Sequence, residues 1–146
     1  TPGWREIEKF AVRMGGATNH RMNLSDAALI KDNHIAATGS ITKAINDVRN
    51  KFPNLSIEVE IDHLDQMEEA IAGTVDLILL DNMSPEECKV AVAQCANRTK
   101  LEASGGITLE NARKYAESGV DFIAIGALTH SAAILDIGLD LQVKGL

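Results

Sequence analysis

The stretch Leu77-Ile78-Leu79-Leu80-Asp81-Asn82-Met83-Ser84-Pro85-Glu86-Glu87 decides the fold class. Its first four residues form a short apolar run, which is typical of a buried strand. The residues from Ser84 to Glu87 have the pattern of a capping box, with proline at the first helical position. A strand that leads directly into a helix is one βα unit.

The same unit recurs along the chain. Further apolar or β-branched runs predict strands at residues 28–30, 57–61, 101–103 and 122–125. The spacing leaves room for a helix in each connection, as parallel pairing requires. Five such units in series leave two architectures, an open doubly wound sheet or a (β/α) barrel.

Three more helices are predicted from their ends and periodicity. Ser40 is expected to cap a helix, and Thr108 is expected to cap another that ends at Ser118 and Gly119. Residues 4–14 also repeat apolar side chains at helical spacing. The apolar face after Ser40 comprises Ile41, Ala44, Ile45, Val48 and Phe52, and that of residues 4–14 comprises Ile7, Phe10, Ala11 and Met14.

Residues 1–146 are predicted to form a single α/β-barrel catalytic domain, without a linker or a low-complexity run. Residues 135–143 alternate apolar and other side chains, which predicts a half-buried strand that leaves the barrel. The chain opens at Thr1 without an initiator methionine, so we expect it to be a fragment.

Composition limits the classes of function. The formal charge of −7 argues against a nucleic-acid-binding protein, which normally carries a basic face. No apolar run is long enough to cross a bilayer, so we expect no membrane association. The two cysteines, Cys88 and Cys95, are too far apart on one helix for a disulfide, which predicts free thiols and a cytoplasmic location.

Charged or glycine-rich residues follow all five predicted strands. The first three strands end at Lys31, Glu60 and Asp81, and the last two end at residues 104–106 and at Gly126. In a βα barrel the carboxyl ends of the strands converge on one mouth. The sequence therefore predicts one pocket with a lysine, two carboxylates and two turns of small residues.

The two turns of small residues predict a phosphate site. Glycines let the backbone approach a ligand closely, and barrels often bind phosphate at the loops after their last two strands. The candidate phosphate-binding residues are Ser104, Gly105, Gly106, Gly126, Ala127 and His130.

The other candidate residues are cationic or acidic. His20, Arg21 and Lys31 lie within twelve residues and suit a substrate with more than one carboxylate. Glu60 and Asp81 are the candidate carboxylates for a metal or for a developing positive charge, and Mg²⁺ prefers such ligands together with substrate phosphates. Glu58 and Asp62 share the face of Glu60 and are expected to be partners or solvated.

Taken together, these motifs resemble the quinolinate phosphoribosyltransferase family in order and spacing over essentially the whole chain. The motifs are Thr1-Pro2-Gly3-Trp4-Arg5, Gly15-Gly16, Asn19-His20-Arg21, Leu29-Ile30-Lys31-Asp32-Asn33-His34, Glu58-Val59-Glu60, Leu80-Asp81-Asn82, Glu102-Ala103-Ser104-Gly105-Gly106-Ile107 and Gly126-Ala127-Leu128-Thr129-His130-Ser131.

The resemblance implies an activity and roles for these residues. Quinolinate and phosphoribosyl pyrophosphate would give nicotinate mononucleotide, pyrophosphate and carbon dioxide, with Mg²⁺, in NAD biosynthesis. His20, Arg21 and Lys31 would hold the quinolinate carboxylates. Glu60 and Asp81, with Lys31, would be the catalytic groups near the ribose and the metal, and the two glycine turns would bind the 5′-phosphate.

The resemblance also implies parts that this sequence lacks. Family members carry an N-terminal sandwich domain and a basic segment that would end at Thr1, and they form dimers or higher oligomers with a shared active site. We therefore expect an incomplete TIM-like barrel without its first strand or strands, and weak turnover by this chain alone. Two alternatives stay open: a paralogous phosphoribosyltransferase for another pyridine carboxylate, and a non-catalytic phosphate-binding barrel.

Overall fold

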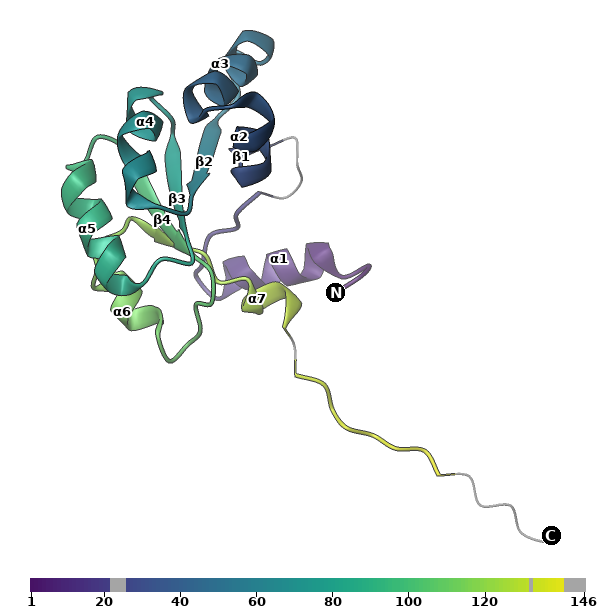
Figure 1. Ribbon diagram of the computed structural model, residues 1–146. Helices are drawn as coiled ribbons and strands as arrows, with labels where there is room; N and C mark the ends of the chain where they lie inside the picture. Colours follow the sequence, from purple (N-terminus) through teal and green to yellow (C-terminus); the bar gives the residue numbers. More distant parts are fainter. Residues whose placement is uncertain (22–25, 132, 141–146) are drawn as a thin grey trace, which may run out of the picture.

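The computed structural model describes residues 1–21, 26–131 and 133–140 and contains a five-stranded parallel sheet (Figure 1). The strands pair in the order in which they occur in the chain. They are β1 (Ala28–Ile30), β2 (Ile57–Ile61), β3 (Leu77–Asp81), β4 (Lys100–Ser104) and β5 (Phe122–Ile123). All five predicted strands are confirmed, although β5 stops two residues before its predicted end.

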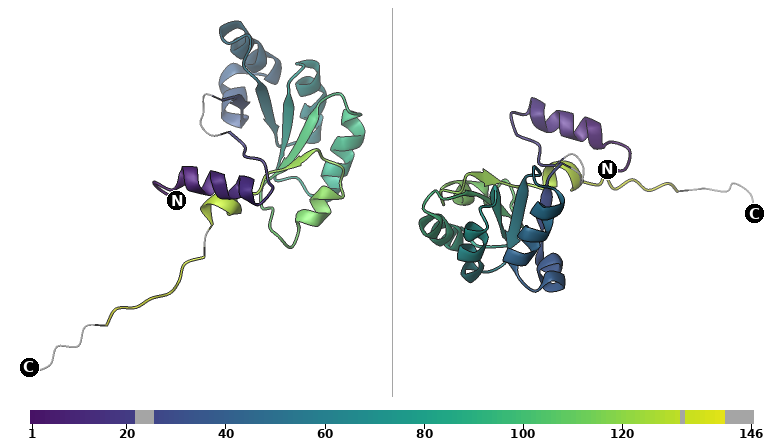
Figure 2. Two further views of the ribbon diagram at one scale, coloured as in Figure 1. Left: turned by 180° about the vertical axis from the view of Figure 1, so that it is seen from behind. Right: turned by 90° about the horizontal axis from the view of Figure 1, so that it is seen from above.

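The helices alternate with the strands. They are α1 (Arg5–Met14), α2 (Asp32–Thr38), α3 (Ile41–Lys51), the 3₁₀ turn η1 (Leu64–Gln66), α4 (Met67–Ala72), α5 (Pro85–Cys95), α6 (Ala112–Ala116) and α7 (Ala127–His130). The sequence did not predict α2, η1 or α4, which are short. Figures 1 and 2 show α3 to α6 along one side of the sheet, while α1 stands apart and lies beside α7.

The hydrophobic core lies between the sheet and these helices. Because side chains alternate along a strand, Ile57, Val59 and Ile61 face the core while Glu58 and Glu60 face the other side. The next two strands follow the same rule. The helices contribute Ile41, Ile45, Met67, Ala70, Cys88, Ala91, Cys95 and Tyr115 to this core. The opposite face of the sheet therefore carries the charged side chains.

The strand order excludes a doubly wound sheet for the described residues. A doubly wound sheet reverses its strand order at a switch point and has helices on both faces. Here the order is sequential and the covering helices α3 to α6 lie on one face. The result is an open, singly wound α/β sheet whose outer strands are β1 and β5.

Two of the three predicted caps are confirmed. The hydroxyl of Ser40 accepts a hydrogen bond from the Lys43 amide at 3.1 Å, and Ser84 and Glu87 form the reciprocal capping box. Thr108 is a correction, because α6 begins only at Ala112 and no side chain caps it. The Thr108 amide instead donates to Asn111 Oδ1 at 2.7 Å.

Apolar side chains in α1 and in residues 135–140 are largely exposed. The predicted apolar face of α1 is largely exposed, with Ile7 at 60 %, Phe10 at 52 % and Met14 at 66 %. The predicted strand at 135–143 is wrong for residues 135–140, which form no strand and are exposed (Figure 1). Residues 141–143 lie outside the described residues.

Cys88 and Cys95 are buried free thiols, as their spacing predicted. Across residues 1–21, 26–131 and 133–140, no helix is long and apolar enough to span a membrane.

Candidate active site

The predicted site residues of the first four strands meet at the carboxyl edge of the sheet. Parallel pairing aligns the strands so that Asp81 lies directly opposite Ser104, and Glu60 is level with Leu79. Lys31 follows β1 immediately and reaches across to Glu60 on β2. The alignment of the strands, together with the alternation of side chains, gathers these groups on the face that α3 to α6 leave uncovered.

Lys31 and Glu60 form an ion pair, with Lys31 Nζ 2.5 Å from Glu60 Oε2. The Glu60 side chain is 10 % exposed, whereas that of Lys31 is 46 % exposed. A nearly buried carboxylate needs a partner charge, because leaving it unpaired away from water is costly. The pair therefore holds both charged groups in place at the carboxyl edge of the sheet.

Asp81 is bound by its neighbour Asn82. Asn82 Nδ2 donates to Asp81 Oδ2 at 2.6 Å, and the Asn82 amide donates to the Ser104 carbonyl at 2.9 Å. The loops after β3 and β4 are thereby joined. Sequence reasoning did not assign Asn82 to the site, although it directly follows Asp81 and precedes a helix cap.

The turn after β4 has the backbone freedom that the sequence predicted. Gly105 has a φ of +92° and Gly106 a φ of +60°, both in the region that favours glycine. A Cβ on Gly105 would lie 2.9 Å from the Asn82 backbone nitrogen, whereas one on Gly106 would meet no atom within 4 Å. The backbone at Gly106 is therefore open to a ligand, and Asn111 Nδ2 holds its carbonyl at 3.0 Å.

The turn after β5 is tight and contains the other candidate phosphate residues. Gly126 precedes the four-residue helix α7, which begins at Ala127 and ends at His130. The His130 ring folds back over Gly126, where a Cβ would be 3.2 Å from its Cδ2. His130 Nδ1 lies 2.9 Å from Ser131 Oγ. Because β4 and β5 are neighbours, the two turns lie at adjacent strand ends.

His20 binds to two carboxylates on the uncovered face of the sheet. Its Nε2 is 3.3 Å from Glu58 Oε2 and 3.8 Å from Glu102 Oε1. The Glu58 carboxylate raises the pKa of His20, and this effect outweighs burial, which lowers it. Burial raises the pKa of Glu102, which is only 6 % exposed.

Sequence reasoning did not assign Glu102 to the site, and it treated Glu58 as a partner or a solvated residue. Both occupy strand positions that alternate with core residues, and that alternation was the available signal. The third predicted cation, Arg21, is turned toward the start of β1, where its guanidinium donates to the Ala27 carbonyl at 3.2 Å. Of the three, Lys31 alone pairs with a predicted catalytic carboxylate.

The candidate metal ligands at the carboxyl edge are the carboxylates of Glu60 and Asp81. Within the described ranges, no group of three or more histidine, cysteine, aspartate or glutamate side chains is arranged to hold a metal ion. Mg²⁺ does not need such a cage, because it is usually bound by one or two carboxylates plus substrate phosphates. Glu60 and Asp81, on one face of neighbouring strands, fit that requirement.

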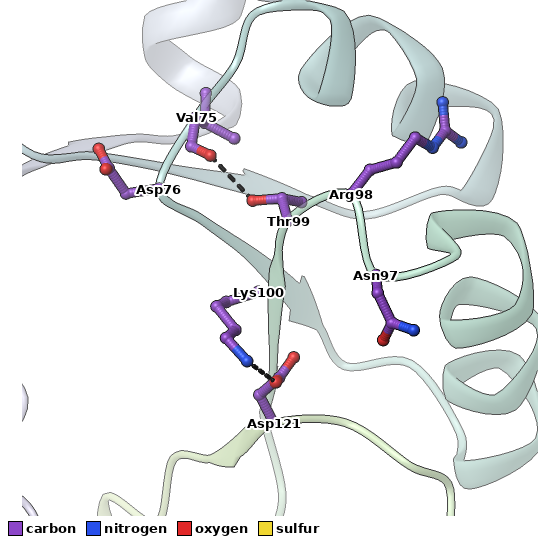
Figure 3. A pocket seen from close by; sticks show the side chains of 7 residues that line it. All are labelled: Val75, Asp76, Asn97, Arg98, Thr99, Lys100 and Asp121. Atoms are coloured by element: carbon purple, nitrogen blue, oxygen red, sulfur yellow. Dashed lines mark hydrogen bonds and ion pairs between the residues drawn. The ribbon is translucent and has the colours of Figure 1, made fainter.

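A cavity of about 340 Å³ lies at the opposite, amino end of the strands (Figure 3). Its cations are already paired: Lys100 Nζ lies 2.6 Å from Asp121 Oδ1, and Arg98 lies 2.6 Å from Glu68. The lining residues are Val75, Asp76, Asn97, Arg98, Thr99, Lys100 and Asp121. Because functional groups of βα barrels collect at the carboxyl ends, this cavity lies outside the candidate active site.

Residues 1–140 match the family described as "Quinolinate phosphoribosyl transferase, C-terminal domain". The chain is 53 % identical over 143 residues to nicotinate-nucleotide pyrophosphorylase (carboxylating) of Mycobacterium leprae. That match covers 96 % of this chain and 50 % of the relative. The chain thus spans about half the length of the curated relatives it matches.

Solved structures agree with this similarity. The crystal structure of NadC from Streptococcus pyogenes superposes with a TM-score of 0.87 at 47 % identity, covering 93 % of this chain and 48 % of that one. Nicotinate-nucleotide pyrophosphorylase from Ehrlichia chaffeensis gives a TM-score of 0.86 at 47 % identity, covering 97 % and 52 %. The arrangement of the sheet is therefore shared with both proteins.

Proposed function

Because the chain belongs to the quinolinate phosphoribosyltransferase family, we propose that it carries the catalytic site for transfer of a phosphoribosyl group to quinolinate. The reaction would join phosphoribosyl pyrophosphate and quinolinate into nicotinate mononucleotide, releasing pyrophosphate and carbon dioxide, in NAD biosynthesis. The observation that carries this proposal is the Lys31–Glu60 ion pair beside Asp81 at the carboxyl edge of the sheet. A site that only bound phosphate would need neither carboxylate.

The cationic side chains bind the acid substrate in this proposal. His20, Arg21 and Lys31 hold the two quinolinate carboxylates and place the pyridine nitrogen against the ribose carbon. Orientation of this kind converts an encounter of two substrates into a reaction within one complex. After the nitrogen has bonded to the sugar, its positive charge favours loss of the neighbouring carboxylate as carbon dioxide, and a proton takes its place.

The carboxylates act on the sugar. As pyrophosphate leaves, the ribose carbon gains positive charge, and Glu60 and Asp81 stabilise that charge from fixed positions. The same two residues would hold Mg²⁺, which supplies neutralising charge to the pyrophosphate when it is bound. Lys31 orients Glu60 through their ion pair.

The turns after β4 and β5 bind the 5′-phosphate in this proposal. The support is the open backbone at Gly106, the neighbouring positions of Ser104 and Gly105, and the turn of Gly126, Ala127 and His130 at the next strand end. Backbone amides at such turns donate to phosphate oxygens without a side chain in the way.

The proposal extends to the surroundings of the chain. The open sheet is part of a TIM-like barrel that further strands complete, and the protein is a homodimer or higher oligomer with a shared active site. The exposed apolar side chains of α1 support an interface there. The buried free thiols support a cytoplasmic location.

The first test is Glu60→Ala in the complete protein. Formation of nicotinate mononucleotide from quinolinate should fall by about 100-fold or more in kcat, because a preorganised charge is lost. Calorimetric affinity for ribose 5-phosphate should stay within a factor of about three, because the phosphate turns are untouched. Glu68→Ala serves as the control, since Glu68 pairs with Arg98 at the far end of the sheet.

Three outcomes would contradict the proposal. Retention of most of the turnover by Glu60→Ala would remove the catalytic role of that carboxylate. Preference of the unaltered protein for nicotinate over quinolinate would point to a paralogous transferase for another pyridine carboxylate. A protein that binds ribose 5-phosphate and turns over neither acid would be a phosphate-binding barrel.

A further inference from the structure

We propose that Glu58 and Glu102 are positioning residues. Their carboxylates pair with the Nε2 atom of His20 and thereby direct its Nδ1 atom toward a carboxylate of the substrate. This inference rests on the proposed function, in which His20 binds quinolinate. It adds two acidic side chains that do not touch the substrate but determine how a cationic one is presented to it.

The geometry of the sheet brings the three residues together. Glu58 is on β2 and Glu102 is on β4, with β3 between them. Neighbouring strands are about 4.8 Å apart, so backbones two strands apart are separated by roughly 10 Å. One imidazole nitrogen lies within 4 Å of both carboxylates because His20, from the segment between α1 and β1, lies over the intervening strand.

Burial makes this contact necessary for the carboxylates. Glu102 is 6 % exposed, and Glu58 Oε2 is buried without a hydrogen bond of good geometry within the described part of the chain. Two largely buried carboxylates beside the same imidazole repel, and a cation between them removes much of that cost. The charge of His20 is therefore attractive to both residues, and turning the ring away would leave both unpaired.

The same contact fixes which nitrogen is left for a ligand. Imidazolium has two N–H donors, and Nε2 is held by the carboxylates, so Nδ1 is the donor that remains. The other charged groups at this residue are Arg21, which lowers the pKa of His20, and Lys9 of α1, whose Nζ donates to the His20 carbonyl at 3.4 Å. The raised pKa of His20 agrees with a ring that is kept cationic.

A positioning role predicts a particular kinetic effect. Without Glu102 the ring is held by one carboxylate and is free to rotate, so binding of the acid substrate weakens. The chemical step at the ribose depends on Glu60 and Asp81, which Glu102 does not contact among the described interactions. The effect should therefore fall on KM for quinolinate rather than on kcat.

The test uses Glu102→Gln in the complete protein, with steady-state kinetics for both substrates. We expect KM for quinolinate to rise about tenfold, with kcat and KM for phosphoribosyl pyrophosphate within about threefold of the unaltered protein. Glu102→Asp, which keeps the charge, should restore part of the affinity and also serves if the glutamine variant folds poorly. Glu68→Gln is the matched control at an ion pair remote from the site.

A double-mutant cycle separates positioning from a general structural effect. If Glu102 acts through His20, Glu102→Gln should raise KM no further in a protein that already carries His20→Ala. Additive losses, or an equal decline of kcat and both KM values, would overturn the inference. An unchanged KM for quinolinate in Glu102→Gln would also overturn it, whereas failure of the unaltered protein to use quinolinate would overturn the proposed function itself.

Discussion

At the scale of single residues, Gly105 couples the phosphate turn to the catalytic carboxylate. Its backbone lies against Asn82, and Asn82 in turn donates a hydrogen bond to Asp81. Asn82 itself has a φ of +53°, a conformation that asparagine tolerates better than most residues. A change at the turn after β4 should therefore reach the end of β3 through one side chain.

Gly105→Ala tests this coupling. The added Cβ would lie 2.9 Å from the Asn82 backbone nitrogen, at a φ of +92° that is strained for alanine. We expect a loss of about 1–3 kcal/mol in the free energy of unfolding, measured by urea denaturation, together with a lower kcat as Asn82 moves.

Gly106→Ala is the control for that change. It also has a positive φ, but its Cβ would meet no atom within 4 Å, so the cost should be only about 1–2 kcal/mol and kcat should change less. Equal stability and equal kcat for the two variants would show that contact with Asn82 does not matter.

At the scale of secondary-structure elements, the helices differ in whether tertiary packing buries the face that the local sequence pattern marks as apolar. Helix α5 has both a capping box and a buried face made by Cys88, Ala91 and Cys95. Helix α1 has an apolar face of similar periodicity, but most of that face is exposed, and Lys9 is its buried residue. Periodicity identifies the apolar face of a helix and leaves open whether that face is buried within this chain.

Ser84→Ala measures the local contribution in α5. The change removes the hydroxyl that accepts from the Glu87 amide at 3.3 Å and that donates to Glu87 Oε2 at 2.7 Å. Thermal and urea unfolding should show a loss of about 1 kcal/mol. Ser84→Thr keeps a hydroxyl that can both accept and donate at this position and should remain within a few tenths of a kcal/mol. A loss as large in the threonine variant would mean that the cap itself contributes little.

At the scale of the whole molecule, the chain exposes surfaces that globular proteins usually cover. The described sheet ends at β1 and β5, the side chains of Ile7, Phe10 and Met14 project into solvent, and residues 133–140 extend away from the body (Figure 1). Exposed apolar patches and unpaired strand edges favour association with another surface.

We therefore expect the 146-residue chain to associate in a concentration-dependent way when purified alone. Light scattering after gel filtration should show species larger than the 15.7 kDa monomer, and the double change Ile7→Ser and Phe10→Ser should reduce them. Leu109→Ser is the control, because Leu109 lies outside α1 and is 91 % exposed. A monomer at all concentrations would contradict the prediction that the α1 face is an interface.

The sequence by itself was sufficient for the features that depend on neighbours along the chain. Alternating or continuous apolar runs predicted all five strands, and Ser40 and Ser84 marked two helix starts, because strand propensity and capping are local free energies. The same apolar runs placed Lys31, Glu60, Asp81 and Ser104 at strand ends, because each of these residues stands where a run stops. Parallel pairing then made one shared edge the expected result, and the structure has it.

Only the tertiary structure decided which distant residues meet. It gave His20 its partners on β2 and β4 and joined Asn82 to Ser104. It also began α6 at Ala112 and formed no strand at residues 135–140. The physical reason is that such contacts depend on the register of the strands and on what covers each surface. Those are properties of the folded arrangement, because the same local pattern is compatible with several partners until the sheet aligns them.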